Sequence, residues 1–129
     1  MHHTREIPRE VWSDYLTLLS SITQAQCVRI EAGSPEIGEQ TLAQRLPLID
    51  ISFEEKGSGQ GSVEVTVGRP GEEITHRILH PDRIYADESE NGELECLDIE
   101  DEEHTKTLIF FEPAEAFAES SDRWSSPPL

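Results

Sequence analysis

Residues 62–79 read SVEVTVGRPGEEITHRIL, and this stretch decides the fold class. Within 63–67 valines alternate with polar residues, and Ile74 and Ile78 share one phase of the second half. The GRPG between the halves favours a tight turn, because glycine and proline supply the backbone angles that turns need. Period-two alternation on both sides of such a turn predicts an antiparallel hairpin with one buried face and one solvated face.

The same alternation predicts further strands before and after this hairpin. They are expected at residues 28–32, 39–46, 49–53, 83–86, 94–100 and 107–111. Pro47 should lie at an edge or a bend between two strands, because proline cannot donate a ladder hydrogen bond. Residues 94–100 carry apolar side chains in both phases, so this strand is either buried on both faces or bulged. Residues 107–111 are apolar in both phases toward their end, which predicts a central strand.

The N-terminal segment predicts one amphipathic helix of about four turns, with Pro8 at its first position. Its apolar stripe is expected to contain Trp12, Tyr15, Leu16, Leu19 and Ile22. Packing of this stripe on the sheet is the favoured interpretation, and a helix that binds a partner is the alternative. Residues 2 and 3, both histidines, are expected in a frayed end.

These elements predict an α+β fold that is mainly antiparallel β. The helix would pack on a meander of about seven or eight strands, curled into either a small barrel or a sandwich. Residues 1–112 are expected to form one domain. Residues 113–129 form an acidic, Ser/Pro-rich tail, with a helical turn at 114–119, which should be loose unless Phe117 and Trp124 dock.

The charge of the chain restricts its partners. The formal net charge is -17, from 27 acidic and 10 basic residues. Repulsion of like charges excludes nucleic-acid backbones and anionic membranes as favoured partners. Cationic partners, metal ions, adaptation to a salty cytoplasm or simple solubility remain as explanations, and the scarcity of lysine agrees with salt adaptation.

Cys27 and Cys96 are the two cysteines, and neither belongs to a metal-binding spacing. Both lie in predicted strands, where a free cysteine behaves as a small hydrophobic residue. The N-terminus lacks the apolar run of a signal peptide, and the longest apolar runs are far shorter than a membrane span. A cytoplasmic location is therefore expected.

One loop resembles a calcium-binding pattern. Residues 87–98 place oxygen-bearing side chains at the first, third, fifth and ninth positions, a glycine at the sixth and a carboxylate at the twelfth. The candidate ligands for Ca²⁺ are Asp87, Ser89, Asn91, Glu93 and Asp98. The flanking segments predict strands rather than the helices of that motif. Asn91-Gly92 is also the standard signal of a two-residue hairpin turn, which is the favoured interpretation.

Motifs for catalysis are scarce in this sequence. No nucleophile elbow, phosphate-binding loop or dinucleotide fingerprint occurs. His76 and His80 could bind one metal only on a helix, because four residues of strand separate side chains by roughly 13 Å. An enzyme with a site at the mouth of the sheet, using these histidines or nearby carboxylates, remains an alternative.

The opening residues 4–12, TREIPREVW, resemble the start of a family of short uncharacterised bacterial proteins, a domain of unknown function. Segments 46–52, 74–78 and 108–111 are similar to later parts of that family. The resemblance extends to about Glu112 and implies a self-contained small domain. It implies no activity, cofactor or catalytic residue.

Together these features predict a non-catalytic binding or accessory module. Its partner would be another protein or a second copy of the chain. A weak divalent-cation binder and a small enzyme are the two alternatives.

Overall fold

A computed structural model describes residues 3–36, 38–55 and 61–112 of this chain. The elements are β1 (His3–Glu6), a 3-10 turn (Arg9–Val11), α1 (Trp12–Ile22), β2 (Cys27–Ser34), β3 (Gly38–Glu54), β4 (Ser62–Arg69), β5 (Glu72–Leu79), β6 (Pro81–Glu88), β7 (Leu94–Asp101) and β8 (Lys106–Phe111). This arrangement confirms the predicted α+β class with a mainly antiparallel sheet. The expectations about residues 113–129 concern a segment outside the described residues.

The eight strands form one antiparallel sheet in the order β1-β6-β7-β8-β2-β3-β4-β5. Strands β2 to β5 form one meander and β6 to β8 form a second. The prediction of a single continuous meander is therefore wrong, although the antiparallel pairing is as expected. The two meanders are joined by pairing of β8 with β2. Among the described strands no ladder joins β1 to β5, so the sheet stays open rather than closing into a barrel.

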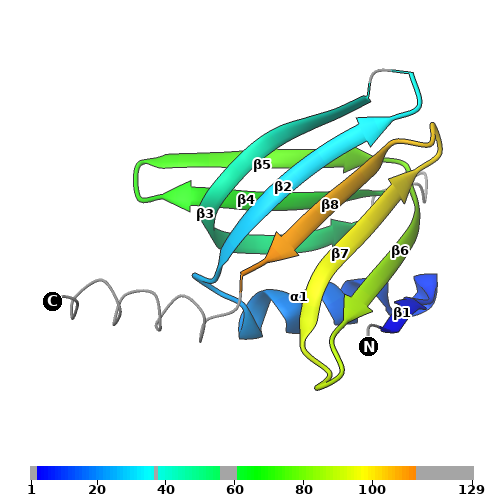
Figure 1. Cartoon of the computed structure of the whole chain (residues 1–129), viewed down its shortest axis with the longest axis horizontal. Helices are drawn as coiled ribbons and strands as arrows, with labels where there is room; N and C mark the ends of the chain where they lie inside the picture. Colours follow the sequence, from blue (N-terminus) through cyan, green and yellow to red (C-terminus); the bar gives the residue numbers. More distant parts are fainter. Residues whose placement is uncertain (1–2, 37, 56–60, 113–129) are drawn as a thin grey trace, which may run out of the picture.

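The sheet folds over because β3 belongs to both of its halves. Its first part pairs with β2 as far as Pro47, and from Leu48 onward it pairs with β4. The sequence predicted two strands here, but the structure has one continuous strand of 17 residues. Pro47 lies where the strand changes partner, as its missing N–H predicted. Figure 1 shows β3 curving from the front layer of β2, β8, β7 and β6 into the rear layer with β4 and β5.

The central hairpin forms as predicted, with Pro70 and Gly71 between its paired strands. The valines of β4 are buried, and so is Ile78 in β5, but Ile74 is 54% exposed. Gly68 is required in this hairpin. Its φ is +136°, and an added Cβ would collide with the carbonyl oxygen of Glu72.

The link from the rear layer to the front layer is a single residue. His80 lies between the end of β5 and the start of β6, and its φ of 54° turns the chain through the corner. Its carbonyl accepts a hydrogen bond from the N–H of Glu102 at 3.1 Å. A corner at this position agrees with the gap between the predicted hairpin at 62–79 and the predicted strand at 83–86.

The helix α1 packs against β3 and closes one end of the space between the layers (Figure 1). Trp12, Leu16 and Leu19 are buried, and the indole Nε1 of Trp12 donates to the carbonyl of Ile7 at 2.8 Å. The expectation for Ile22 is wrong, because this side chain is 69% exposed. Pro8 precedes a 3-10 turn as its N-terminal cap residue, not as the first residue of the α-helix.

Two further expectations concern the chain ends and the cysteines. His3 is not in a frayed end, because it begins β1 and pairs with Glu88 of β6. Cys27 and Cys96 are both free thiols, with Cys96 buried.

Among the described residues, no helix has the length and apolar character needed to cross a membrane.

The packing of α1 is tested by replacing Leu16, which is fully buried, with alanine. We expect Leu16→Ala to lower the free energy of unfolding by about 2–5 kcal/mol, measured by urea denaturation, because it leaves a cavity in the core. Leu18→Ala is the matched control on the same helix, where the side chain is 61% exposed and the change should stay within about 0.5 kcal/mol. Equal losses for both variants would contradict the packing described.

Candidate functional site

A groove of about 520 Å³ lies between α1 and the tip of the β6–β7 hairpin, which reach the same end of the molecule (Figure 1). Its apolar lining contains Tyr15, Leu18, Leu19, Ile22, Leu94 and Phe111. The side chains of Leu19 and Phe111 also belong to the core. The groove therefore has a floor that is continuous with the packed interior.

The exposed wall of this groove comes from a second apolar stripe on α1. Leu18 and Ile22 are one helical turn apart and lie beside the buried stripe that contains Leu19. The sequence prediction placed Ile22 in the buried stripe and overlooked Leu18. Residue periodicity alone does not separate this exposed position from the buried stripe beside it, so the sequence held no clear signal for Leu18.

The rim of the groove is acidic. Glu88, Glu93 and Glu95 lie around it, together with one basic side chain, that of Arg5. The Arg5 guanidinium is 3.2 Å from the carboxylate of Glu88 and 5.8 Å from the ring centre of Tyr15. Because Arg5 is engaged with Glu88, the rim presents a negative potential to an approaching ligand.

The predicted calcium loop forms a hairpin connection between β6 and β7. The expected two-residue turn at Asn91-Gly92 is wrong, because residues 89–93 all lie between the paired Glu88 and Leu94. The hydroxyl of Ser89 accepts hydrogen bonds from the N–H groups of Asn91 and Glu93, at 3.2 and 3.3 Å. Asp87 lies in the ladder opposite Cys96, and Asp98 lies further along β7 opposite Tyr85. Within residues 3–36, 38–55 and 61–112, no group of three His, Cys, Asp or Glu side chains is arranged to hold a metal ion. Calcium binding at this turn stays a prediction.

The two histidines of the enzyme alternative occupy different surroundings. His76 is half-buried in β5 opposite Val65, and this burial lowers its pKa. His80 is exposed at the corner between β5 and β6. Neither residue lines the groove described above. A catalytic role for them stays a prediction.

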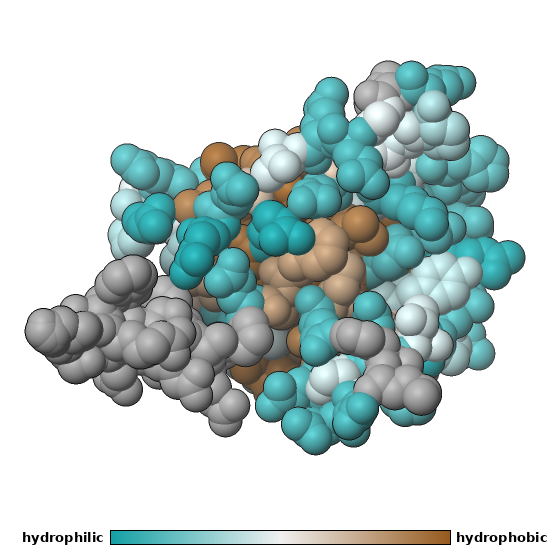
Figure 2. All heavy atoms as spheres, viewed as in Figure 1, coloured by the Kyte–Doolittle hydropathy of each residue, from teal (hydrophilic) through white to brown (hydrophobic). Residues whose placement is uncertain are grey.

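A second candidate surface is the outer face of β6, β7, β8 and β2, which Figure 2 shows as a hydrophobic centre among hydrophilic side chains. Half-buried Leu108 and Phe110 lie on this face, and the Arg29 guanidinium covers the ring of Phe110 at 4.2 Å. A hollow of about 460 Å³ at one end is lined by Glu31, Glu39, Glu100, His104 and Lys106, among others.

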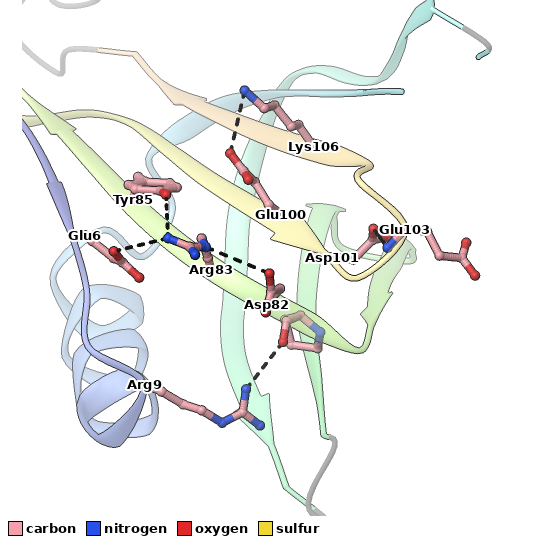
Figure 3. A network of polar contacts seen from close by, with 10 residues as sticks. Glu6, Arg9, Asp82, Arg83, Tyr85, Glu100, Asp101, Glu103 and Lys106 are labelled. Atoms are coloured by element: carbon pink, nitrogen blue, oxygen red, sulfur yellow. Dashed lines mark hydrogen bonds and ion pairs between the residues drawn. The ribbon is translucent and has the colours of Figure 1, made fainter. Parts of the chain in front are cut away.

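Charged side chains form a network across these strands (Figure 3). Lys106 is 3.6 Å from the carboxylate of Glu100, which lies opposite it in the ladder. Arg83 lies 3.8 Å from Glu6 and 3.9 Å from Asp82, and it donates to the Tyr85 hydroxyl at 3.5 Å. The exposed members of this network contribute little stability each, because solvent screens them.

Asp98 is the unusual member of this face. Its Oδ1 atom is buried and has no hydrogen-bond partner among the described residues. Burial raises the pKa of this carboxyl to about 6, the neighbouring Glu100 raises it too, and Lys106 opposes the shift. Burial, with Asp98 and Asp87 nearby, also raises the pKa of the Cys96 thiol to about 12. Both groups are therefore biased toward their neutral forms.

The burial of Asp98 follows from the position of β7, a strand that was predicted at 94–100 to be either buried on both faces or bulged. Leu97 and Ile99 are buried on the inner face and Cys96 is buried on the outer face, so the prediction of burial on both faces is right. The β6–β7 pairing also has a register shift between Asp87 and Glu88. Asp98 shares the outer phase with Cys96, which is why a carboxyl is desolvated there.

The fold and the groove define a small α+β domain, built on an open, bent antiparallel sheet with one helix across its end. The chain belongs to a family of unknown function, DUF5335, whose sequence model matches residues 3–120. An uncharacterized protein of Aquifex aeolicus (strain VF5) is 32% identical over 111 residues, which cover 86% of this chain and 94% of that relative. No solved structure matches this chain. The predicted membership of a short uncharacterised family is thus confirmed. That the opening TREIPREVW is characteristic of this family stays a prediction.

The buried carboxyl gives a pH-dependent prediction. The pKa of Asp98 is about 6 in the folded protein, above its ordinary value of 3.8. The folded state therefore binds more protons than the unfolded state between these values, and this residue's contribution to stability falls as pH rises through about 6. We expect Asp98→Asn to raise Tm at about pH 7.5 and to leave it nearly unchanged at about pH 4.

The measurement is thermal unfolding of both proteins across this pH range. Glu102→Gln is the control, because Glu102 is an exposed carboxylate in the turn after β7. Its effect on Tm should be small at every pH. If the Tm difference between Asp98→Asn and the unaltered protein is the same at every pH, ionisation of Asp98 does not contribute to the change in stability.

Proposed function

We propose that this protein is a non-catalytic binding module whose groove takes a basic, amphipathic segment of another protein. The observation that carries the proposal is the exposure of Leu18 and Ile22, at 61% and 69%, above an apolar floor. Large apolar side chains gathered at a groove with a polar rim are typical of interaction sites.

The spacing of these residues suits a helical ligand. Side chains one turn apart on α1 form a ridge, and a helix that packs on such a ridge contributes apolar anchors at similar intervals. Full burial of a leucine-sized side chain contributes about 1.5–3 kcal/mol. Burial of Leu18 and Ile22, together with Leu94 across the groove, can supply most of the free energy of binding for a complex of moderate affinity.

The charge of the rim selects the kind of segment. Three glutamates against one arginine favour lysine and arginine at the edges of the ligand, and the net charge of -17 attracts a cationic segment from a distance. The same field opposes nucleic acids and anionic lipid surfaces. A cationic protein segment is thus the partner that both the floor and the rim support.

The binding test uses a synthetic amphipathic helix with leucines on one face and lysines on the other, labelled for fluorescence anisotropy. We expect Leu18→Glu or Ile22→Glu to weaken binding by at least about tenfold, because each places a charge in the apolar wall. Leu42→Glu is the matched control, since Leu42 is an exposed leucine on β3 away from the groove.

A second peptide, with glutamates in place of the lysines, separates charge from hydrophobicity. It should bind far more weakly than the lysine peptide. Equal binding of both peptides, or equal effects of the Leu42 and Leu18 variants, would contradict the proposal. Tighter binding by a full chain carrying Phe117→Ala and Trp124→Ala would indicate that residues 113–129 compete for the groove.

Adaptation to a salty cytoplasm is the second part of this proposal. The excess of acidic residues creates repulsion within the folded protein, and dissolved cations screen it. We expect Tm to rise between low and molar KCl by more than it does for a neutral domain of similar length. A Tm that is flat in KCl would mean that the acidity serves another purpose, such as attraction of the cationic partner.

A further inference from the structure

The strand β5 is the long free edge of the sheet. It pairs with β4 over all eight of its residues without a register shift, and no described strand pairs with its other side. The opposite edge, β1, has four residues. Figure 1 shows the β4–β5 hairpin projecting past the front layer, which leaves its turn end uncovered.

Natural edge strands usually carry features that prevent pairing with another chain. Short length, charged side chains (lysine above all), proline and β-bulges are the common ones. β5 is eight residues long without lysine, proline or a bulge, and its charged side chains are those of Glu72, Glu73 and Arg77. It also exposes Ile74 and Leu79, at 54% and 57%, one on each face of the strand. A long, regular edge with exposed apolar side chains is able to pair with another strand.

The backbone groups available for pairing follow from the hairpin. Arg69 and Glu72 close the two-residue turn, and such a closing pair is hydrogen-bonded. The alternation of an antiparallel ladder then directs the N–H and C=O groups of Glu73, Thr75 and Arg77 away from β4. These residues face the free edge.

The side chains at these three positions are self-complementary. When Thr75 of one copy lies opposite Thr75 of another, Glu73 lies opposite Arg77, and the two-fold axis repeats this opposite-charge pair. Centring on Glu73 or Arg77 instead would place like charges opposite each other. Arg77 is 2.8 Å from Glu64 of β4, and 60% of its side chain is exposed, which leaves room for a second carboxylate to approach it.

We propose that β5 joins two copies of this chain edge to edge, antiparallel and centred on Thr75, so that the eight-stranded sheets become one continuous sheet. The interface is isologous, and each copy contributes the same strand. Ile74 of each copy would lie beside His76 of the other on the inner face. This interface lies on β5 and is separate from the groove proposed for a partner.

Sedimentation velocity of the full chain tests this proposal, from low micromolar up to roughly 1 mM protein, where weak specific association is detected. About 0.15 M KCl limits the long-range repulsion between two acidic copies to a distance of about 8 Å. We expect a concentration-dependent dimer. A protein that stays monomeric over this range would overturn the proposal, and the edge would then be free for an extended segment of a different protein.

Two sets of variants identify the edge. Thr75→Pro should abolish the dimer, because proline cannot donate across the free edge, while the N–H at this position is not needed for pairing with β4. Glu73→Arg and Arg77→Glu should each weaken self-association at least about tenfold by placing like charges opposite each other.

The charge variants also allow a rescue that a folding defect could not produce. A mixture of the Glu73→Arg chain with the Arg77→Glu chain restores opposite charges at both positions. We expect this mixture to form a heterodimer at a protein concentration at which each chain alone stays mainly monomeric. A dimer that survives Thr75→Pro, or a mixture that stays monomeric, would show that β5 pairing in this register is wrong.

Discussion

The architecture depends on one constraint, which is that a single strand serves both halves of the sheet. The partner change in β3 at Pro47 turns the sheet back on itself, so that the inner faces of the two layers bury each other's aliphatic side chains. The helix can then cover the open end, where Trp12 meets Phe53 of β3 edge to face with ring centres 5.3 Å apart. Without the bend, the valines of β4 and the inner residues of β7 would not share one core, and each set would be exposed to solvent unless another element packed on it.

Much of this fold could be predicted from residue alternation, because strand faces follow a period of two. The hairpin at 62–79 and the strands after it appear where the pattern places them. Two aspects could not be predicted in this way. The continuity of β3 through Pro47 depends on the tertiary bend, and β1 is a polar segment whose strand form depends on pairing with β6. Which strands become neighbours is likewise invisible to local pattern, as the pairing of β8 with β2 shows.

The candidate sites were harder to predict than the fold, for a physical reason. Leu18 and Ile22 are apolar residues on a helix, and sequence alone does not tell a core position from an exposed one beside it. Asp98 is one carboxyl among many in an acidic chain. Its burial arises from neighbours on three strands, so its raised pKa becomes visible only with the sheet assembled. The match of residues 87–98 to a calcium-binding pattern was the alternative to a hairpin between two strands, and the structure divides these residues between a turn and two ladders.

The pairing of β1 with β6 and of β2 with β8 has a consequence for how the chain folds during synthesis. Arg5 meets Glu88 across 83 residues of sequence, and Val28 meets Phe111 across a similar distance. Contacts of such long range make folding slow, because a large loop must close before they form. The first strand to leave the ribosome is thus among the last to find its partner. Until β8 emerges, the outer side of β2 is an open edge for which a nascent-chain chaperone could compete.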